Sequence, residues 1–88
     1  MNNKTATGDA DFFLDITDEV CPLTFVKTKL QIERMLPGQT LEVRLRGREP
    51  LGNVPRSVEE HGHTVLALTL EDPAQPPDGV HRLKLRKT

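Results

Sequence analysis

The chain has 88 residues, a formal net charge of −1 and a single cysteine. This length gives one small domain with a core of modest depth, and the single cysteine excludes an internal disulfide framework and a multi-cysteine zinc or Cys-x-x-Cys redox site. The near-neutral charge and only three phenylalanines disfavour nucleic acid as a partner, and because no apolar run is long enough for a membrane span or a signal peptide, we expect a cytoplasmic protein without membrane insertion.

The first residues of the chain, 1–11, are polar and have no hydrophobic period, which predicts a flexible leader ahead of a single domain over residues 12–88. The domain opens with a short alternating run, residues 12–16, that is typical of a strand. Its apolar side chains on one face are Phe12, Leu14 and Ile16. A short connection, residues 17–20, leads from this strand to the cysteine.

Cys21 stands directly before Pro22, and proline is favoured as the first residue of a helix because its fixed φ suits the helix and its missing N–H would have no intrahelical partner. Cys21 is therefore expected at or next to the N-cap, where unpaired N–H groups and a partial positive charge lower the pKa of a thiol. The acids Asp18 and Glu19 act in the opposite direction, because nearby negative charge raises a thiol pKa. A small buried and unreactive Cys21 is the alternative, and the residues alone leave both open.

Residues 22–36 carry a helical pattern with two apolar strips. The first strip is expected to face the sheet and consists of Phe25, Ile32 and Leu36, with Thr28, Lys29 and Met35 beside it. The second strip begins beside the cysteine and consists of Leu23, Val26 and Leu30. It either packs on a second helix or forms a docking surface for a partner that must reach Cys21. Pro37-Gly38 ends the helix.

The middle of the chain predicts a strand, a loop and a short helix. Residues 40–46 alternate between leucine or valine and charged side chains, which is typical of a strand in a sheet covered on one side only. Residues 47–53, with Pro50 and Gly52, predict a loop. Residues 54–61 then predict a helix that tolerates its proline in the first turn and ends at Gly62.

Two further strands close the chain. Residues 63–71 are apolar on both faces, which predicts a central strand. Residues 72–79 are rich in proline, aspartate and glycine and form a surface connection. Residues 80–86 predict the last strand, with Leu83 and Leu85 facing inward. The expected order is therefore strand, helix, strand, helix, strand, strand.

Several short motifs stand at matched places along this order, and together they resemble the TusA/SirA-like sulfur carrier proteins from about Phe12 to the end of the chain. The matching residues are Leu14-Asp15, Cys21-Pro22, Pro37-Gly38-Gln39, Leu41-Glu42-Val43, Val54-Pro55 and Gly62-His63-Thr64-Val65. The family pattern is Cys-Pro-x-Pro preceded by a loop glycine. This chain has Thr24 in place of the second proline and Asp18 in place of the glycine.

The resemblance implies a two-layer α+β sandwich, with a four-stranded mixed sheet and two helices on one face. It also implies that Cys21 accepts sulfane sulfur as a persulfide from a cysteine desulfurase or rhodanese-like donor and passes it to an acceptor protein. Such a chain is a sulfurtransferase-type carrier rather than a multiple-turnover enzyme. It is expected to act as a monomer without a metal or an organic cofactor, since each step only exchanges one sulfur–sulfur bond for another.

Further residues are expected to support Cys21. The helix N-terminus is formed by Pro22, Leu23 and Thr24, and Thr24 restores an N–H that can donate to a thiolate or persulfide. Partner docking is expected at Leu23, Val26, Lys27 and Leu30.

Alternatives to the carrier role stay open at this stage. The same fold can serve as a non-catalytic regulatory or docking module, or Cys21 can act as a thiol-redox sensor. The histidines are not placed near Cys21 by the sequence, and His61 and His63 lack an evident third ligand for a metal. Three arginines are either ordinary solvated side chains or steer an acidic partner or an anionic donor such as thiosulfate: Arg44, Arg46 and Arg48.

Overall fold

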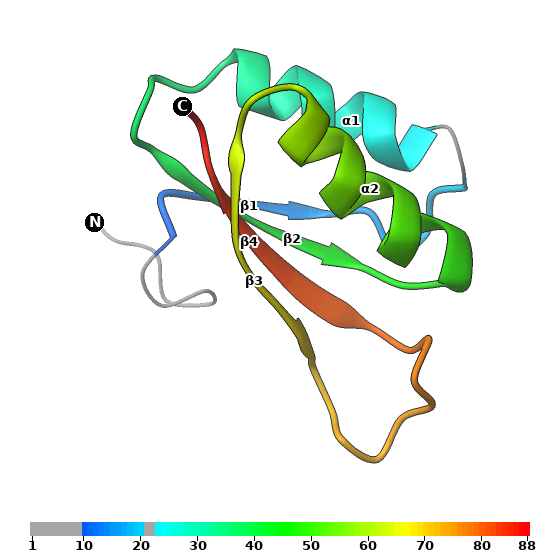
Figure 1. The fold of residues 1–88 in the computed structure, drawn as a ribbon. Coiled ribbons are helices and arrows are strands. Elements are labelled where there is room, and N and C mark those ends of the chain that lie inside the picture. The colour runs from blue at the N-terminus through cyan, green and yellow to red at the C-terminus, as the bar shows by residue number, and fades with distance from the viewer. Residues whose placement is uncertain (1–9, 21–22) are drawn as a thin grey trace.

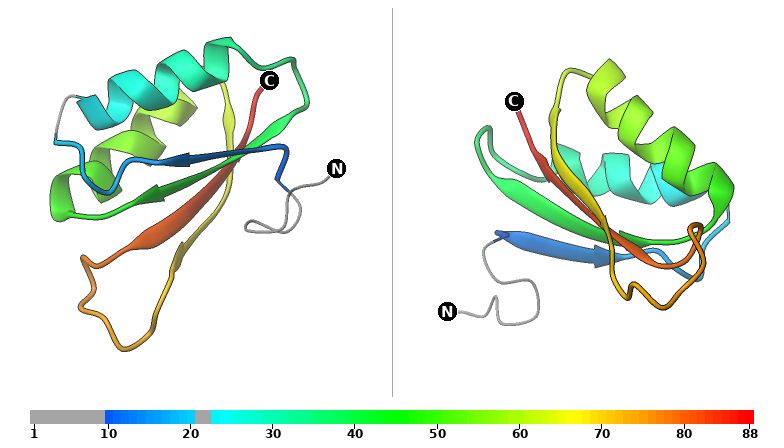
Figure 2. Two further views of the ribbon diagram at one scale, coloured as in Figure 1. Left: turned by 180° about the vertical axis from the view of Figure 1, so that it is seen from behind. Right: turned by 60° about the horizontal axis from the view of Figure 1, so that its bottom comes forward.

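A computed structural model describes residues 10–20 and 23–88 and shows a two-layer α+β sandwich (Figure 1). The elements are β1 (Phe12–Asp15), α1 (Leu23–Glu33), β2 (Thr40–Leu45), α2 (Arg48–Glu60), β3 (Thr64–Leu70) and β4 (His81–Arg86). The four strands form one sheet, and both helices cover the same face of it (Figure 2). The predicted fold class and element order are confirmed. Within the described residues, neither helix has the length and apolar character needed to cross a membrane.

The strand order in the sheet is β1-β2-β4-β3. β1 runs parallel to β2, whereas β2 and β3 are both antiparallel to β4, so the sheet is mixed. The prediction that residues 63–71 form a central strand was wrong, because β3 lies at an edge. Most residues of β3 are exposed, so the apolar residues on both of its faces indicated neither burial nor a second neighbouring strand.

The hydrophobic core lies between the sheet and the helices. β2 and β4 supply the leucines and valine that the alternation predicted on the covered face, and all of them are fully buried. The buried core residues are Ile16, Ile32, Met35, Leu41, Val43, Leu45, Val54, Val58, Leu83 and Leu85.

The face that α1 turns to the sheet matches the predicted one in part, because Ile32, Thr28 and Met35 are buried as expected. Its buried residues are Thr24, Thr28 and Ile32, and the Thr28 hydroxyl donates to the Thr24 carbonyl at 2.8 Å. The Thr28 hydroxyl is satisfied within the helix, which allows it to be buried. Thr24 is the buried residue of this face that a search for apolar side chains misses. The helix ends at Glu33, and Leu36, which was expected to face the sheet, is 68% exposed.

α2 begins at Arg48, so the predicted loop over residues 47–53 was wrong for all but its first residue. Gly47 precedes the helix with φ of +102°, a conformation that favours glycine. Pro50 lies in the first turn, where the N–H groups have no intrahelical partner and a missing one costs nothing. Val54 and Val58 are buried one turn apart, as their spacing predicted.

The described chain is tied to the sheet before β1 begins. Ala10 is buried. The backbone N–H of Asp11 donates to the Thr40 hydroxyl at 3.0 Å, and the Thr40 N–H donates to the Asp11 carboxylate at 2.9 Å. Residues 1–9 of the expected leader lie outside the described residues.

Candidate functional site

Cys21 and Pro22, the expected reacting residue and the expected first residue of its helix, lie outside the described residues. The residues on either side of them are described. Val20 is 70% exposed, and the N–H of Leu23, the first residue of α1, donates to the Val20 carbonyl at 2.8 Å. The described chain therefore enters a helix directly after the Cys-Pro pair, as the sequence predicted.

Three apolar side chains on α1 form an exposed strip that starts beside this pair. The α1 strip consists of Leu23, Val26 and Leu30, each between 41% and 50% exposed. The alternative that it packs on a second helix was wrong, because α2 meets α1 elsewhere: the rings of Phe25 and His61 lie 5.4 Å apart between their centroids. An apolar strip left open beside the candidate residue is the arrangement expected of a docking surface.

Lys27, also expected to dock a partner, is paired within the chain. Its Nζ lies 2.6 Å from Oε2 of Glu19. The pair is partly exposed and contributes less than about 1 kcal/mol to folding. It also offsets the negative charge of Glu19, one of the acids expected to raise the pKa of the Cys21 thiol. Thr24, the expected support residue, lies in the first turn of α1 and is fully buried.

An open cleft of about 630 Å³ borders Val20, the residue before Cys21. Its walls are the connection from β1 to α1 and the start of α2, with Asp78 from the β3–β4 loop. Two of the three arginines considered for steering line it, Arg46 and Arg48. Four acids share the same lining: Asp18, Glu19, Glu49 and Asp78. Acids outnumber arginines, so this cleft suits a basic protein loop better than a small anion.

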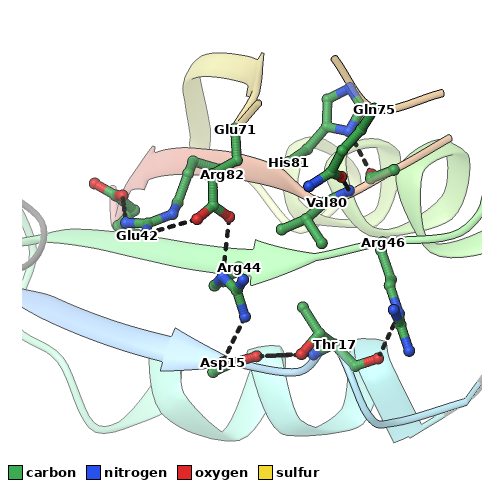
Figure 3. Close-up of polar contacts among 11 residues, drawn as sticks. Asp15, Thr17, Glu42, Arg44, Arg46, Glu71, Gln75, Val80, His81 and Arg82 are labelled. Atoms are coloured by element: carbon green, nitrogen blue, oxygen red, sulfur yellow. Dashed lines mark hydrogen bonds and ion pairs between the residues drawn. The ribbon is translucent and has the colours of Figure 1, made fainter. Parts of the chain in front are cut away.

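Arg44 does not reach the cleft, because it belongs to an ion-pair network across the uncovered face of the sheet (Figure 3). Arg44 contacts Asp15 at 3.2 Å and Glu71 at 2.9 Å, and Arg82 contacts Glu71 at 3.3 Å and Glu42 at 2.7 Å. The ring of Phe13 lies 5.3 Å from the Arg82 guanidinium. The network joins residues up to 40 positions apart in the chain, so no local sequence pattern predicts it.

The network also contributes to lowered pKa values of two of its carboxylates. The hydrogen bond from Arg44, followed by that from Arg82, lowers the pKa of Glu71. The pKa of Asp15 is lowered chiefly by hydrogen bonds from the backbone N–H and the hydroxyl of Thr17, with Arg44 adding to them. Both carboxylates are therefore held ionised, and the open face carries paired charges rather than an apolar surface.

The histidines have structural contacts. Nδ1 of His61 lies 2.8 Å from the Ser57 carbonyl, and Nδ1 of His81 lies 2.8 Å from the Gly79 carbonyl. Burial, followed by the positive charges of Lys87 and His61, lowers the pKa of His63. Across residues 10–20 and 23–88, no group of three or more histidine, cysteine, aspartate or glutamate side chains is placed to hold a metal ion.

Comparison with solved structures finds the same fold in another protein. The SirA-like protein from Desulfitobacterium hafniense matches this chain with a TM-score of 0.69 at 18% sequence identity, over 85% of this chain and 95% of that one. At this identity the likeness establishes the fold alone. The molecule is therefore a small two-layer α+β domain with the same fold as that protein.

Comparison with sequences then identifies the family. Residues 12–87 match the family described as "Sulfurtransferase TusA". A "Putative sulfur carrier protein" of Archaeoglobus fulgidus is 47% identical over 60 residues, 68% of each chain. YedF of Escherichia coli, named in the same way, is 32% identical over 63 residues, 72% of this chain and 82% of that one. The chain belongs to the TusA sulfurtransferase family, a family of sulfur carriers, and the predicted resemblance is confirmed.

Proposed function

We propose that this protein carries sulfane sulfur as a persulfide on Cys21 and hands it to an acceptor protein. The observation that carries the proposal is membership of the TusA family together with a sequence that holds one cysteine only. With a single thiol in the chain, sulfur transfer by this protein has one candidate position. A free thiol of this kind suits the reducing cytoplasm.

The chemistry is a pair of thiol exchange steps. In the first, the Cys21 thiolate attacks the outer sulfur of a donor persulfide, the sulfur–sulfur bond of the donor breaks, and the donor leaves as a thiolate. In the second, an acceptor thiolate attacks the outer sulfur on Cys21 in the same way. Each step forms one sulfur–sulfur bond and breaks one, so no external oxidant or reductant takes part.

The α1 strip and Lys27 are the proposed docking surface for donor and acceptor. A partner has to bring its own sulfur to Cys21. The strip begins at Leu23, two residues after Cys21 in the chain, and extends along α1. The acid-rich cleft beside Val20 adds a second contact for a partner whose sulfur-bearing loop is basic. Pro22, Leu23 and Thr24 are proposed to supply the helix N-terminus that stabilises negative sulfur.

Mass spectrometry of the intact protein tests the proposal. Incubation with rhodanese and thiosulfate is expected to add one sulfur atom, about 32 Da, and thiosulfate without rhodanese serves as the control. Cys21→Ser is expected to show no gain. Transfer is then followed by adding a reduced thiol protein and measuring loss of the added mass.

The exposed α1 strip also favours a second function, a docking module that regulates a partner without carrying sulfur. Two results together would establish the docking module and reject the carrier. Neither rhodanese nor a cysteine desulfurase would add mass to the protein, and wild type and Cys21→Ser would bind the same partner equally. Oxidation of Cys21 by dilute peroxide to a sulfenic acid, in a protein that takes no sulfur, would indicate a redox sensor instead.

A further inference from the structure

Two lysines of α1 are held in opposite directions along the helix. Nζ of Lys27 lies 2.6 Å from Oε2 of Glu19, which precedes the helix. Nζ of Lys29 lies 3.1 Å from Oε2 of Glu33, the last residue of the helix. Both lysine side chains are 47% exposed. The two lysines therefore differ in where their charge is held and not in burial, and Lys27 is the one whose charge is held beside the connection that leads to Cys21.

Glu19 is held by its backbone as well as by its side chain. Its N–H donates to the Ile16 carbonyl at 3.1 Å. Ile16 is fully buried, and its own N–H donates to the Arg44 carbonyl in β2 at 2.9 Å. The ion pair with Lys27 therefore joins α1 to a segment that is already attached to the sheet.

Glu19 precedes Cys21 by two residues. An extended chain spans at most about 3.6 Å per residue, so the two Cα atoms are about 7 Å apart or less. A carboxylate at this distance disfavours the thiolate, because like charges repel. The ammonium group of Lys27 opposes this effect, because its positive charge lies 2.6 Å from the carboxylate oxygen.

The other described charges around this connection make the contribution of Lys27 more important. The cleft beside Val20 is lined by more acids than arginines. Its charged residues are Asp18, Glu19, Glu49 and Asp78, with Arg46 and Arg48. Such an excess of negative charge disfavours a thiolate nearby. Pairing with Lys27 removes one of the acids from this balance.

We propose that Lys27 is a positioning residue for sulfur transfer. By pairing with Glu19 it offsets the carboxylate nearest to Cys21 in the chain and keeps more of the thiol in the reactive thiolate form. The inference rests on the proposed function, in which the thiolate makes the first attack. It gives Lys27 a chemical role before any partner binds, in addition to docking. Because the pair is partly exposed, the effect is modest: two unit charges about 7 Å apart in water change the thiolate fraction by about threefold.

The ultraviolet absorbance of the thiolate, followed against pH, tests the proposal. The chain has one cysteine and neither tyrosine nor tryptophan, so Cys21 can be followed alone. Lys27→Met is expected to shift the titration to higher pH, with about threefold less thiolate on the acid side of the midpoint. Lys27→Arg keeps the charge and should titrate like wild type, whereas Glu19→Gln should shift the titration to lower pH. Lys29→Met is the matched control, because Lys29 is equally exposed and paired elsewhere; it should cause no shift.

The double variant Glu19→Gln/Lys27→Met tests whether the pair is the cause. It lacks both charges, so its midpoint should return to that of wild type. Circular dichroism establishes that each variant folds. The proposal is overturned if Lys27→Met titrates like wild type, if Lys29→Met shifts the titration as far, or if the double variant keeps the full shift of Lys27→Met.

Sulfur loading from rhodanese and thiosulfate separates this inference from the carrier role. On the acid side of the midpoint, Lys27→Met should load up to about threefold more slowly even at saturation, since a more basic thiolate is less abundant but a better nucleophile. Loss of docking alone would slow loading only at low concentration. A shifted titration in a protein that takes no sulfur would reject the carrier and support the inference. Normal loading with an unshifted titration would do the reverse.

Discussion

Replacement of Leu30 by alanine tests whether the α1 strip contacts the sulfur donor. Full burial of a leucine contributes about 1.5–3 kcal/mol. Leu30 is 50% exposed in the free chain, so docking can bury about the other half of its surface. The variant is therefore expected to lose about 1 kcal/mol of docking energy, which corresponds to a roughly fivefold weaker interaction.

The assay is the initial rate of persulfide loading from rhodanese and thiosulfate, with this protein well below saturation. Leu30→Ala should load about fivefold more slowly at low concentration and reach the wild-type rate at saturation, because the chemical step is untouched. The buried half of Leu30 also supports folding, and a loss of about 1 kcal/mol lowers Tm by roughly 4–8 °C in a domain of this size. Loading is therefore measured at 25 °C, on protein shown to be folded.

Leu36→Ala is the matched control, since Leu36 is a more exposed leucine beyond the end of α1 and outside the strip. It should load at the wild-type rate. If Leu30→Ala loads like wild type at every concentration, or if both variants slow equally, the strip is not the contact surface.

Three other predictions concern stability. Leu83→Ala, in the fully buried centre of β4, should lower the free energy of unfolding in urea by about 2–5 kcal/mol; a loss under 1 kcal/mol would show that the core is loosely packed there. The folded-state pKa of His63 lies below its usual 6.5, so the unfolded chain binds a proton first, and stability should fall as pH drops below about 6.5; His63→Gln should flatten this part of the profile, and an unchanged slope would reject His63 as its source. The lowered pKa values of Asp15 and Glu71 give stability that is present above about pH 4.5 and is lost as pH falls through those lowered values; Glu71→Gln should shrink this acid-side loss, and a profile identical to wild type would show that the ion-pair network contributes nothing.

Local patterns in the sequence were sufficient to predict the elements that depend only on residues close to one another in the chain. The leucines of β4 alternate with basic residues, and the structure buries the leucines and leaves the basic residues on the open face. The Cys-Pro pair predicted the start of α1 to within one residue of its described beginning at Leu23. Proline before a helix and alternation in a strand are set by steric and solvation effects that act within a few residues.

Other features depend on contacts between distant residues. Thr24 is fully buried in α1 although its side chain is polar, a property of the packed interface that the helical pattern alone does not show. The start of α2 at Arg48 was not predicted, because Pro50 is as typical of a loop as it is of the first turn of a helix. The partners of Arg44 and Arg82 lie on other strands or, for Glu71, directly after β3, so only the assembled sheet brings them together.

The sequence by itself determined the family, the order of the elements and the presence of a single thiol, the one proposed to carry sulfur, because each follows from short-range pattern and residue identity. Only the tertiary structure decided that the α1 strip stays uncovered and that β3 lies at an open edge. Both depend on which segments pack side by side, and that is settled when the whole chain buries its core at once.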